Sequence, residues 1–216
     1  MARTHSTRTA ARLAPDTEPE KRRAILHAAV RVFAEKGYHG CRIADVARAA
    51  DVAYGLVYHY FRNKDELLES VFAEQWAMLI NALRAVDAGP GTAAEKIAGM
   101  CGFVFDVYKT SPAPVRVLLL EVSRTANSLR AGSTRETFET ATGIVADVVR
   151  QGQDTGELRR DVDPQIAAVG LLGTLELALS AMIVGVIAPG PSEEAIDRVK
   201  QQVVELVLAG LRRRAP

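Results

Sequence analysis

Two tyrosines, a histidine and a glycine lie close together in one short run, and helical spacing turns all four the same way. In residues 53–61, AYGLVYHYF, the apolar Ala53 and Val57 share one helical face. The opposite face carries Tyr54, Gly55, Tyr58 and His59, and no acid. Phenol and imidazole groups can reach phosphates and base edges, and glycine lets a backbone approach closely. The pattern therefore favours contact with a DNA groove.

A second short helix precedes this run and must position it. Four apolar side chains of residues 43–50 share one helical face: Ile43, Val46, Ala47 and Ala50. A break at residues 51–52 separates the two segments, so together they predict a helix-turn-helix. The same spacing also suits two helices of an ordinary three-helix core, and spacing by itself leaves both interpretations open.

The remaining reactive side chains show no arrangement for catalysis or metal binding. The four histidines, His5, His27, His39 and His59, all precede residue 65 and lack the spacing of a metal site. The sequence has no G-x-S-x-G motif and no glycine loop of the kind that cradles phosphates. We therefore expect no enzymatic activity, no bound metal and no cofactor.

Charge is divided unevenly along the 216-residue chain. Residues 1–64 hold 12 Lys and Arg against 6 Asp and Glu, whereas residues 65–216 hold 15 against 20, giving net charges of +6 and −5. This division fits a domain that meets phosphates joined to one that does not. The two cysteines offer no disulfide framework and no signal peptide is visible, so we expect a cytoplasmic protein.

The basic residues at the start of the chain allow two interpretations. We expect residues 1–18 to form a disordered basic tail, which is either a solvated arm or an arm that reaches the DNA minor groove. Lys21, Arg22 and Arg23 oppose the dipole of the helix they open, so they either contact phosphate or form a solvated face.

A set of short motifs runs in order through residues 20–68. They are Ile25-Leu26, Ala28-Ala29, FAEKGY at 33–38, IADVA at 43–47, Val52, VYHYF at 57–61 and KDELL at 64–68. In this order they resemble the N-terminal domain of the TetR family of bacterial transcriptional regulators. The resemblance implies a dimeric DNA-binding regulator, usually a repressor, which a small and often apolar effector releases from its operator.

The outward face and the resemblance together indicate which residues meet double-stranded DNA. The expected contact residues are Arg42, Ala53, Tyr54, Gly55, Leu56, Tyr58, His59 and Lys64. Cys41 and Arg42 stand where the family has two small hydroxyl residues, and this change removes a helix N-cap. Ala53 and Leu56 likewise stand where small polar residues are frequent. Lys64, at a helix N-terminus, is implied to bind a phosphate.

Helical periodicity predicts an all-α chain without a sheet. The first helix should run from about residue 19 to residue 36, with Gly37 after its end. Asn63 and Glu66 form a capping pair for a helix over residues 64–88, which would span roughly 36 Å and link two domains. The further helices are expected over residues 92–109, 114–124, 134–153, 163–187 and 192–213.

Two C-terminal helices are apolar enough to join two copies of the chain. Residues 163–187 are apolar nearly all round, and Glu176 in their middle argues against a membrane span. With residues 192–213 they predict a four-helix bundle in a homodimer, an intramolecular pair being the alternative. The expected interface residues are Leu175, Leu179, Ile183, Val199, Val203, Leu206 and Val207.

The helices between these ends are rich in aromatic residues and methionine, most of which we expect in the core. The resemblance implies an effector pocket among them. The expected pocket residues are Trp76, Met100, Phe103, Tyr108, Phe138 and Glu176. Glu176 must find a partner or stay protonated, and an arginine across the subunit interface is the alternative to an effector.

The sequence thus predicts an all-α protein with three parts. Residues 1–18 form the tail, residues 19–64 a three-helix DNA-binding domain, and residues 65–216 a helical effector-binding and dimerisation domain that begins with the long helix. The predicted function is a dimeric, sequence-specific transcriptional regulator. An architectural DNA-binding protein that needs no effector is the alternative.

Overall fold

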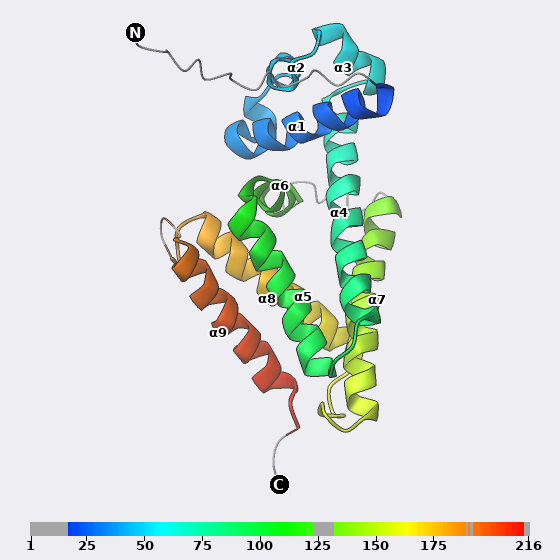
Figure 1. Cartoon of the computed structure of the whole chain (residues 1–216), viewed down its shortest axis with the longest axis vertical. Coiled ribbons are helices and arrows are strands. Elements are labelled where there is room, and N and C mark those ends of the chain that lie inside the picture. Colours follow the sequence, from blue (N-terminus) through cyan, green and yellow to red (C-terminus); the bar gives the residue numbers. More distant parts are fainter. Residues whose placement is uncertain (1–16, 123–131, 189, 191, 214–216) are drawn as a thin grey trace, which may run out of the picture.

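The described residues of this computed structural model form α-helices joined by short turns (Figure 1). The structure describes residues 17–122, 132–188, 190 and 192–213. Within these ranges the one strand-like contact is an isolated bridge between Leu158 and Arg212. The predicted all-α class is therefore confirmed. The predicted basic tail, apart from residues 17 and 18, lies outside the described residues.

Three helices form the N-terminal domain, which we call the head: α1 (Glu18–Gly40), α2 (Ile43–Ala50) and α3 (Tyr54–Tyr60). Helix α1 begins slightly earlier than predicted, because Thr17 and Glu20 form a capping box that satisfies both backbone N–H groups. Gly37 interrupts α1 with a φ of 69°, as its predicted place after a helix end requires.

The head core is a compact apolar cluster that brings the three helices together. Ile25 and Phe33 of α1 pack with Val46 of α2 and Val57 of α3, and all four are buried. The cluster also takes in Leu67 and its neighbours from the next helix, so the hydrophobic core extends beyond residue 64. The turn between α2 and α3 is fixed by Asp51, whose φ of 56° is left-handed.

Helix α4 (Lys64–Ala88) connects the head to the rest of the molecule (Figure 1). Its 25 residues span about 37 Å. Asn63 Oδ1 caps it by accepting from the N–H of Glu66 at 2.8 Å. The predicted return bond from Glu66 to Asn63 is wrong. Glu66 instead accepts from the backbone N–H and the Nε of Arg62, at 2.7 and 2.9 Å.

Five further helices form the body: α5 (Ala93–Thr110), α6 (Pro112–Val122), α7 (Gly132–Asp154), α8 (Pro164–Ile183) and α9 (Glu193–Leu211). Helix α6 begins before residue 114 because proline is tolerated in a first turn. Helix α8 ends before residue 187 because Gly185 takes a φ of 77°. The body core lies between α4, α5, α7 and α8, around Ile97, Phe105 and Val145.

Helix α6 lies between the head and the body. Figure 1 shows it beneath α1, at the upper end of α5. Val117 is buried in the head core, whereas Val115, two residues earlier, is buried in the body core. The head therefore rests on the body through α6 as well as through α4.

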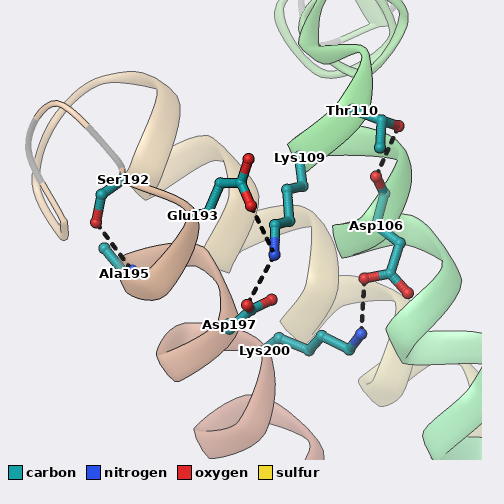
Figure 2. A network of polar contacts seen from close by, with 8 residues as sticks. All are labelled: Asp106, Lys109, Thr110, Ser192, Glu193, Ala195, Asp197 and Lys200. Carbon is teal, nitrogen blue, oxygen red and sulfur yellow. Dashed lines mark hydrogen bonds and ion pairs between the residues drawn. The ribbon is translucent and has the colours of Figure 1, made fainter.

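Polar contacts fasten α9 to α5 (Figure 2). Lys109 Nζ lies 2.8 Å from an Asp197 oxygen and 3.4 Å from a Glu193 oxygen, and Lys200 Nζ lies 2.7 Å from Asp106. The hydrogen bond to Asp197, more than any other contact, raises the pKa of Lys109. One side of α9 therefore packs against α5, and its opposite side is exposed.

Helix α8 is the one described helix long and apolar enough to cross a membrane on length and composition. One third of its most apolar window is buried within the chain. Core helices of soluble proteins meet the same criterion, so the apolar character of α8 is weak evidence for a membrane.

Candidate nucleic-acid interface and effector domain

Helix α3 presents two tyrosines to solvent while its inner side packs into the head. Val57 is fully buried, whereas Tyr54 and Tyr58 are 53% and 45% exposed. The Tyr54 hydroxyl donates to the Tyr58 hydroxyl at 3.3 Å, and the rings meet edge to face. This hydrogen bond is the main cause that raises the pKa of Tyr58. Tyr58 therefore stays neutral near pH 7, and its hydroxyl can both donate and accept.

His59 and Tyr60, at the end of α3, both contact the first turn of α1. The Nε2 of His59 lies 3.5 Å from an oxygen of the Glu18 carboxylate, and both side chains are mostly exposed. The Tyr60 hydroxyl donates to the backbone oxygen of Glu18 at 3.2 Å. Burial, followed by the charge of Glu18, raises the pKa of Tyr60. These contacts hold α3 against the start of α1.

Arg42 lies exposed at the N-cap of α2, where its side chain caps nothing. The cap contact comes instead from Asp45, whose Oδ2 accepts from the N–H of Arg42 at 2.9 Å. Asp45 also pairs with Lys36 at 2.9 Å, and this contact is the largest cause that lowers the pKa of Asp45. The guanidinium of Arg42 remains available for an anion beside the N-terminus of α2.

Lys64 makes structural contacts that sequence reasoning missed. Its Nζ donates to the backbone oxygens of Tyr38 and Cys41, at 2.7 and 3.0 Å, and lies 4.2 Å from the Tyr38 ring centroid. The Tyr38 hydroxyl donates to Asp65, the next residue in α4. An ammonium has three donors, so one remains for a phosphate.

The other predicted DNA contacts on α3 differ in their exposure to solvent. Ala53 is exposed at the N-cap of α3 without a side-chain cap, and Leu56 is half-buried. Gly55 is exposed, and no atom within 4 Å would meet a β-carbon there. The space beside Gly55 is open for the approach of a second molecule.

The predicted pocket residues fall into two groups. Met100 and Tyr108 are buried in the body core, Trp76 packs against that core, and Phe103 is half-buried. Phe138 is 41% exposed and Glu176 is exposed on α8, so neither lies in the core of the single chain. Helix α8 faces its own core with its other side, which turns Glu176 outward.

Two polar residues of α4 are candidates that sequence reasoning missed. Gln75 is buried beside Trp76, and an Oε2 atom of Glu74 is buried with no hydrogen-bond partner within the described part of the chain. Gln75 lies four residues after Val71 and four residues before Leu79. This helical spacing could have predicted that Gln75 shares their inward face of α4. Within the described ranges no group of three or more His, Cys, Asp or Glu is placed to hold a metal.

Sequence profiles match both parts of the chain. The profile described as bacterial regulatory proteins of the tetR family matches residues 25–71. The profile of the tetracyclin repressor-like C-terminal domain matches residues 94–207, more than half of the chain. The chain belongs to the TetR family.

Individual relatives agree with this family in sequence and in structure. The fatty acid metabolism regulator protein of Bacillus subtilis is 27% identical over 87% of this chain and 93% of its own length. The structure of FadR from Bacillus subtilis in complex with stearoyl-CoA is 26% identical, with a TM-score of 0.76 over 87% of this chain and 98% of that one. KstR2 of Mycobacterium tuberculosis, a ketosteroid regulator, has the same fold, with 23% identity and a TM-score of 0.72 over 94% of this chain and all of that one.

The exposed apolar surface of this TetR-family chain differs from the predicted interface. Leu175 and Leu179 are 4% and 1% exposed, and Val203 is also buried, so all three face their own core. Ile183, Val199 and Val207 are half-buried, and Leu206 is 68% exposed. The exposed apolar residues of α8 are instead Ile166, Val169 and Leu177. We call these three residues and Leu206 the outer apolar face.

Proposed function

We propose that the chain is a dimeric, sequence-specific transcriptional regulator that represses by binding an inverted-repeat operator through α3. The observation that carries the proposal is the outward side of α3, where Tyr54, Tyr58 and His59 are exposed and α3 itself contributes no acid. This side belongs to the basic head of a TetR-family chain. Duplex DNA as the target makes the cytoplasm its compartment, and the proposal assigns the chain no catalytic step.

The outer apolar face supports a dimer of this regulator. Leu177 and Leu206 are 72% and 68% exposed in the single chain. Exposed apolar side chains that gather on one surface mark a protein–protein interface. Pairing α8 and α9 with those of a second copy would bury this face in a four-helix bundle. A recognition helix of seven residues makes a small interface, so two copies reading two half-sites would supply the affinity.

A long-chain acyl thioester of coenzyme A is the effector that we propose. The FadR relative from Bacillus subtilis, which aligns with 87% of this chain, was solved in complex with stearoyl-CoA. Met100 and Tyr108 of the body core and Trp76, which packs against it, suit an acyl chain and one polar contact. Phe103 is half-buried on the same helix as Met100, and Gln75 is a buried polar residue of α4. Release requires that the effector bind the DNA-incompetent arrangement more tightly than the DNA-bound one.

Two experiments test these proposals. Selection of bound duplexes from random oligonucleotides should yield an inverted repeat, and selection of no sequence would contradict operator recognition. Stearoyl-CoA should raise the melting temperature and weaken binding to the selected duplex, whereas coenzyme A without an acyl chain should do neither. If DNA binding is tight but no acyl-CoA changes it, an architectural role without this effector becomes the better description.

A further inference from the structure

An acidic side chain of α1 lies against the DNA-facing end of α3. The Glu18 carboxylate is 3.5 Å from Nε2 of His59, and the two side chains are 73% and 61% exposed. A DNA phosphate approaching His59 would therefore meet a carboxylate of the same sign. Contact between His59 and DNA requires that the two anions share or exchange the imidazole.

The main chain around Glu18 is held in place independently of this carboxylate. Thr17 and Glu20 cap the helix on either side, and the Tyr60 hydroxyl binds the backbone oxygen of Glu18. An acid in the first turn is also favoured by the helix dipole. Replacing the carboxylate of Glu18 by an amide would consequently leave the backbone tie to α3 intact.

We propose that Glu18 competes intramolecularly with DNA phosphate for His59, and that this competition makes DNA binding depend on protonation of His59. The proposal rests on the proposed function, since it requires α3 to face DNA. A neutral imidazole leaves the carboxylate and a phosphate to repel each other. A protonated imidazole donates from both nitrogens and carries a positive charge, so it can bridge the two anions.

The other charged groups near this end of α3 make contacts of their own. From α1, the guanidinium of Arg22 lies 5.3 Å from the Phe61 ring centroid. Arg62, after α3, is paired with Glu66. Tyr58 and Tyr60 have raised pKa values and stay neutral. From α2, which packs on the buried side of α3, no described contact reaches His59.

The test measures duplex binding by fluorescence anisotropy at about pH 5.5 and about pH 8, on either side of the usual histidine range. The probes are a labelled random-sequence duplex and the duplex obtained by selection. The parent protein should bind both more tightly at the lower pH, by about tenfold, which is the scale of one charge-assisted contact. His59→Gln should lose most of this difference.

Glu18→Gln supplies the decisive comparison. It should bind several-fold more tightly than the parent at about pH 8 and should show a smaller difference between the two pH values. Glu35→Gln removes the same charge from an exposed position on the same helix, about 25 Å further along it, and should behave as the parent. His27→Gln and His39→Gln should keep the pH dependence, and thermal melting confirms that each variant is folded.

The outcomes separate the two proposals. If no variant binds any duplex at low ionic strength, DNA binding itself fails. If the parent binds but Glu18→Gln matches it at both pH values, or if His59→Gln keeps the full pH dependence, the competition between Glu18 and phosphate is overturned while DNA binding stands.

Discussion

At the scale of single residues, the predicted DNA contacts of the head are side chains of α3 that point away from the head core. Spacing alone separates Val57, which is buried, from Tyr54 and Tyr58, which are exposed. Helical periodicity determines this division locally, so the sequence was sufficient to predict it. Their contact with DNA stays a prediction.

Replacing Tyr58 with alanine should weaken binding to the selected duplex by about 1 to 3 kcal/mol, the range for one specific contact. The cause would be the loss of a neutral hydroxyl and of an exposed ring. Anisotropy titration measures this change, and circular dichroism should show unchanged helix content because Tyr58 lies outside the core. Tyr58→Phe, the matched control for the ring, should lose less. Equal affinity of parent and Tyr58→Ala would remove Tyr58 from the interface.

Lys64 has a structural role and a predicted phosphate-binding role, which separate experiments can distinguish. Lys64→Ala should destabilise the protein by about 1 to 3 kcal/mol, since its ammonium donates to two backbone oxygens and lies over the ring of Tyr38. Urea unfolding measures this loss, and Lys64→Met keeps the apolar stem as the control.

If Lys64 also binds phosphate, both variants should flatten the salt dependence of DNA binding. An unchanged salt slope would restrict Lys64 to its structural role. The sequence could not predict that role, because the two oxygens belong to residues 26 and 23 positions earlier in the chain.

At the scale of helices, the ends were predicted better than the faces. Asn63, Asp163 and Ser192 each accept from backbone N–H groups of the first turn that follows. Such caps depend on three or four consecutive residues, and sequence patterns record them directly. The return bond of Glu66 was predicted wrongly because Arg62, on the other side of Asn63, competes for the same carboxylate.

The faces of α8 show why a helix can be predicted while its orientation cannot. Helix α8 is apolar on nearly all sides, so periodicity does not distinguish the side that meets its own core from the side that meets a partner. Leu175 and Leu179 were placed on the outer side for this reason, and they are buried instead. Glu176 lies on the exposed side of the same helix, and its place in an effector pocket stays a prediction.

Helix α2 should contribute acid sensitivity to the head. Asp45 has a lowered pKa, caused first by its hydrogen bond to Lys36, so its contribution to stability is present above the ordinary value of 3.8 and is lost as the pH falls through its lower folded value. The melting temperature of Asp45→Asn should therefore be below that of the parent near pH 7, and the two should converge below about pH 3.8. Asp51→Asn is a control at a position where asparagine tolerates a left-handed backbone. A gap that persists in acid would contradict this account.

At the scale of the whole molecule, function requires two heads at a fixed separation. Helix α4 transmits the position of the body to the head over about 37 Å. The ion pairs of Lys109 and Lys200 hold α9 on α5, which turns the exposed side of α9 outward beside α8.

Leu177→Glu should convert the protein to a monomer, because it places a charge on the most exposed residue of the outer apolar face. Sedimentation velocity measures this change, and binding to an inverted repeat should weaken far more than binding to random duplex. Met78→Glu makes the same substitution at an exposed position of α4 and should leave the dimer intact. A Leu177→Glu protein that sediments as the parent does would mean that the outer apolar face is not the interface.

Helix α6 has a consequence for how the protein melts. Val117 belongs to α6 of the body but is buried in the head core. A head expressed without the body would therefore lack this valine and have an apolar cavity in its place. Calorimetry of the intact chain should accordingly record one heat-absorption peak rather than two. The head and the body would then unfold together, as a single cooperative unit.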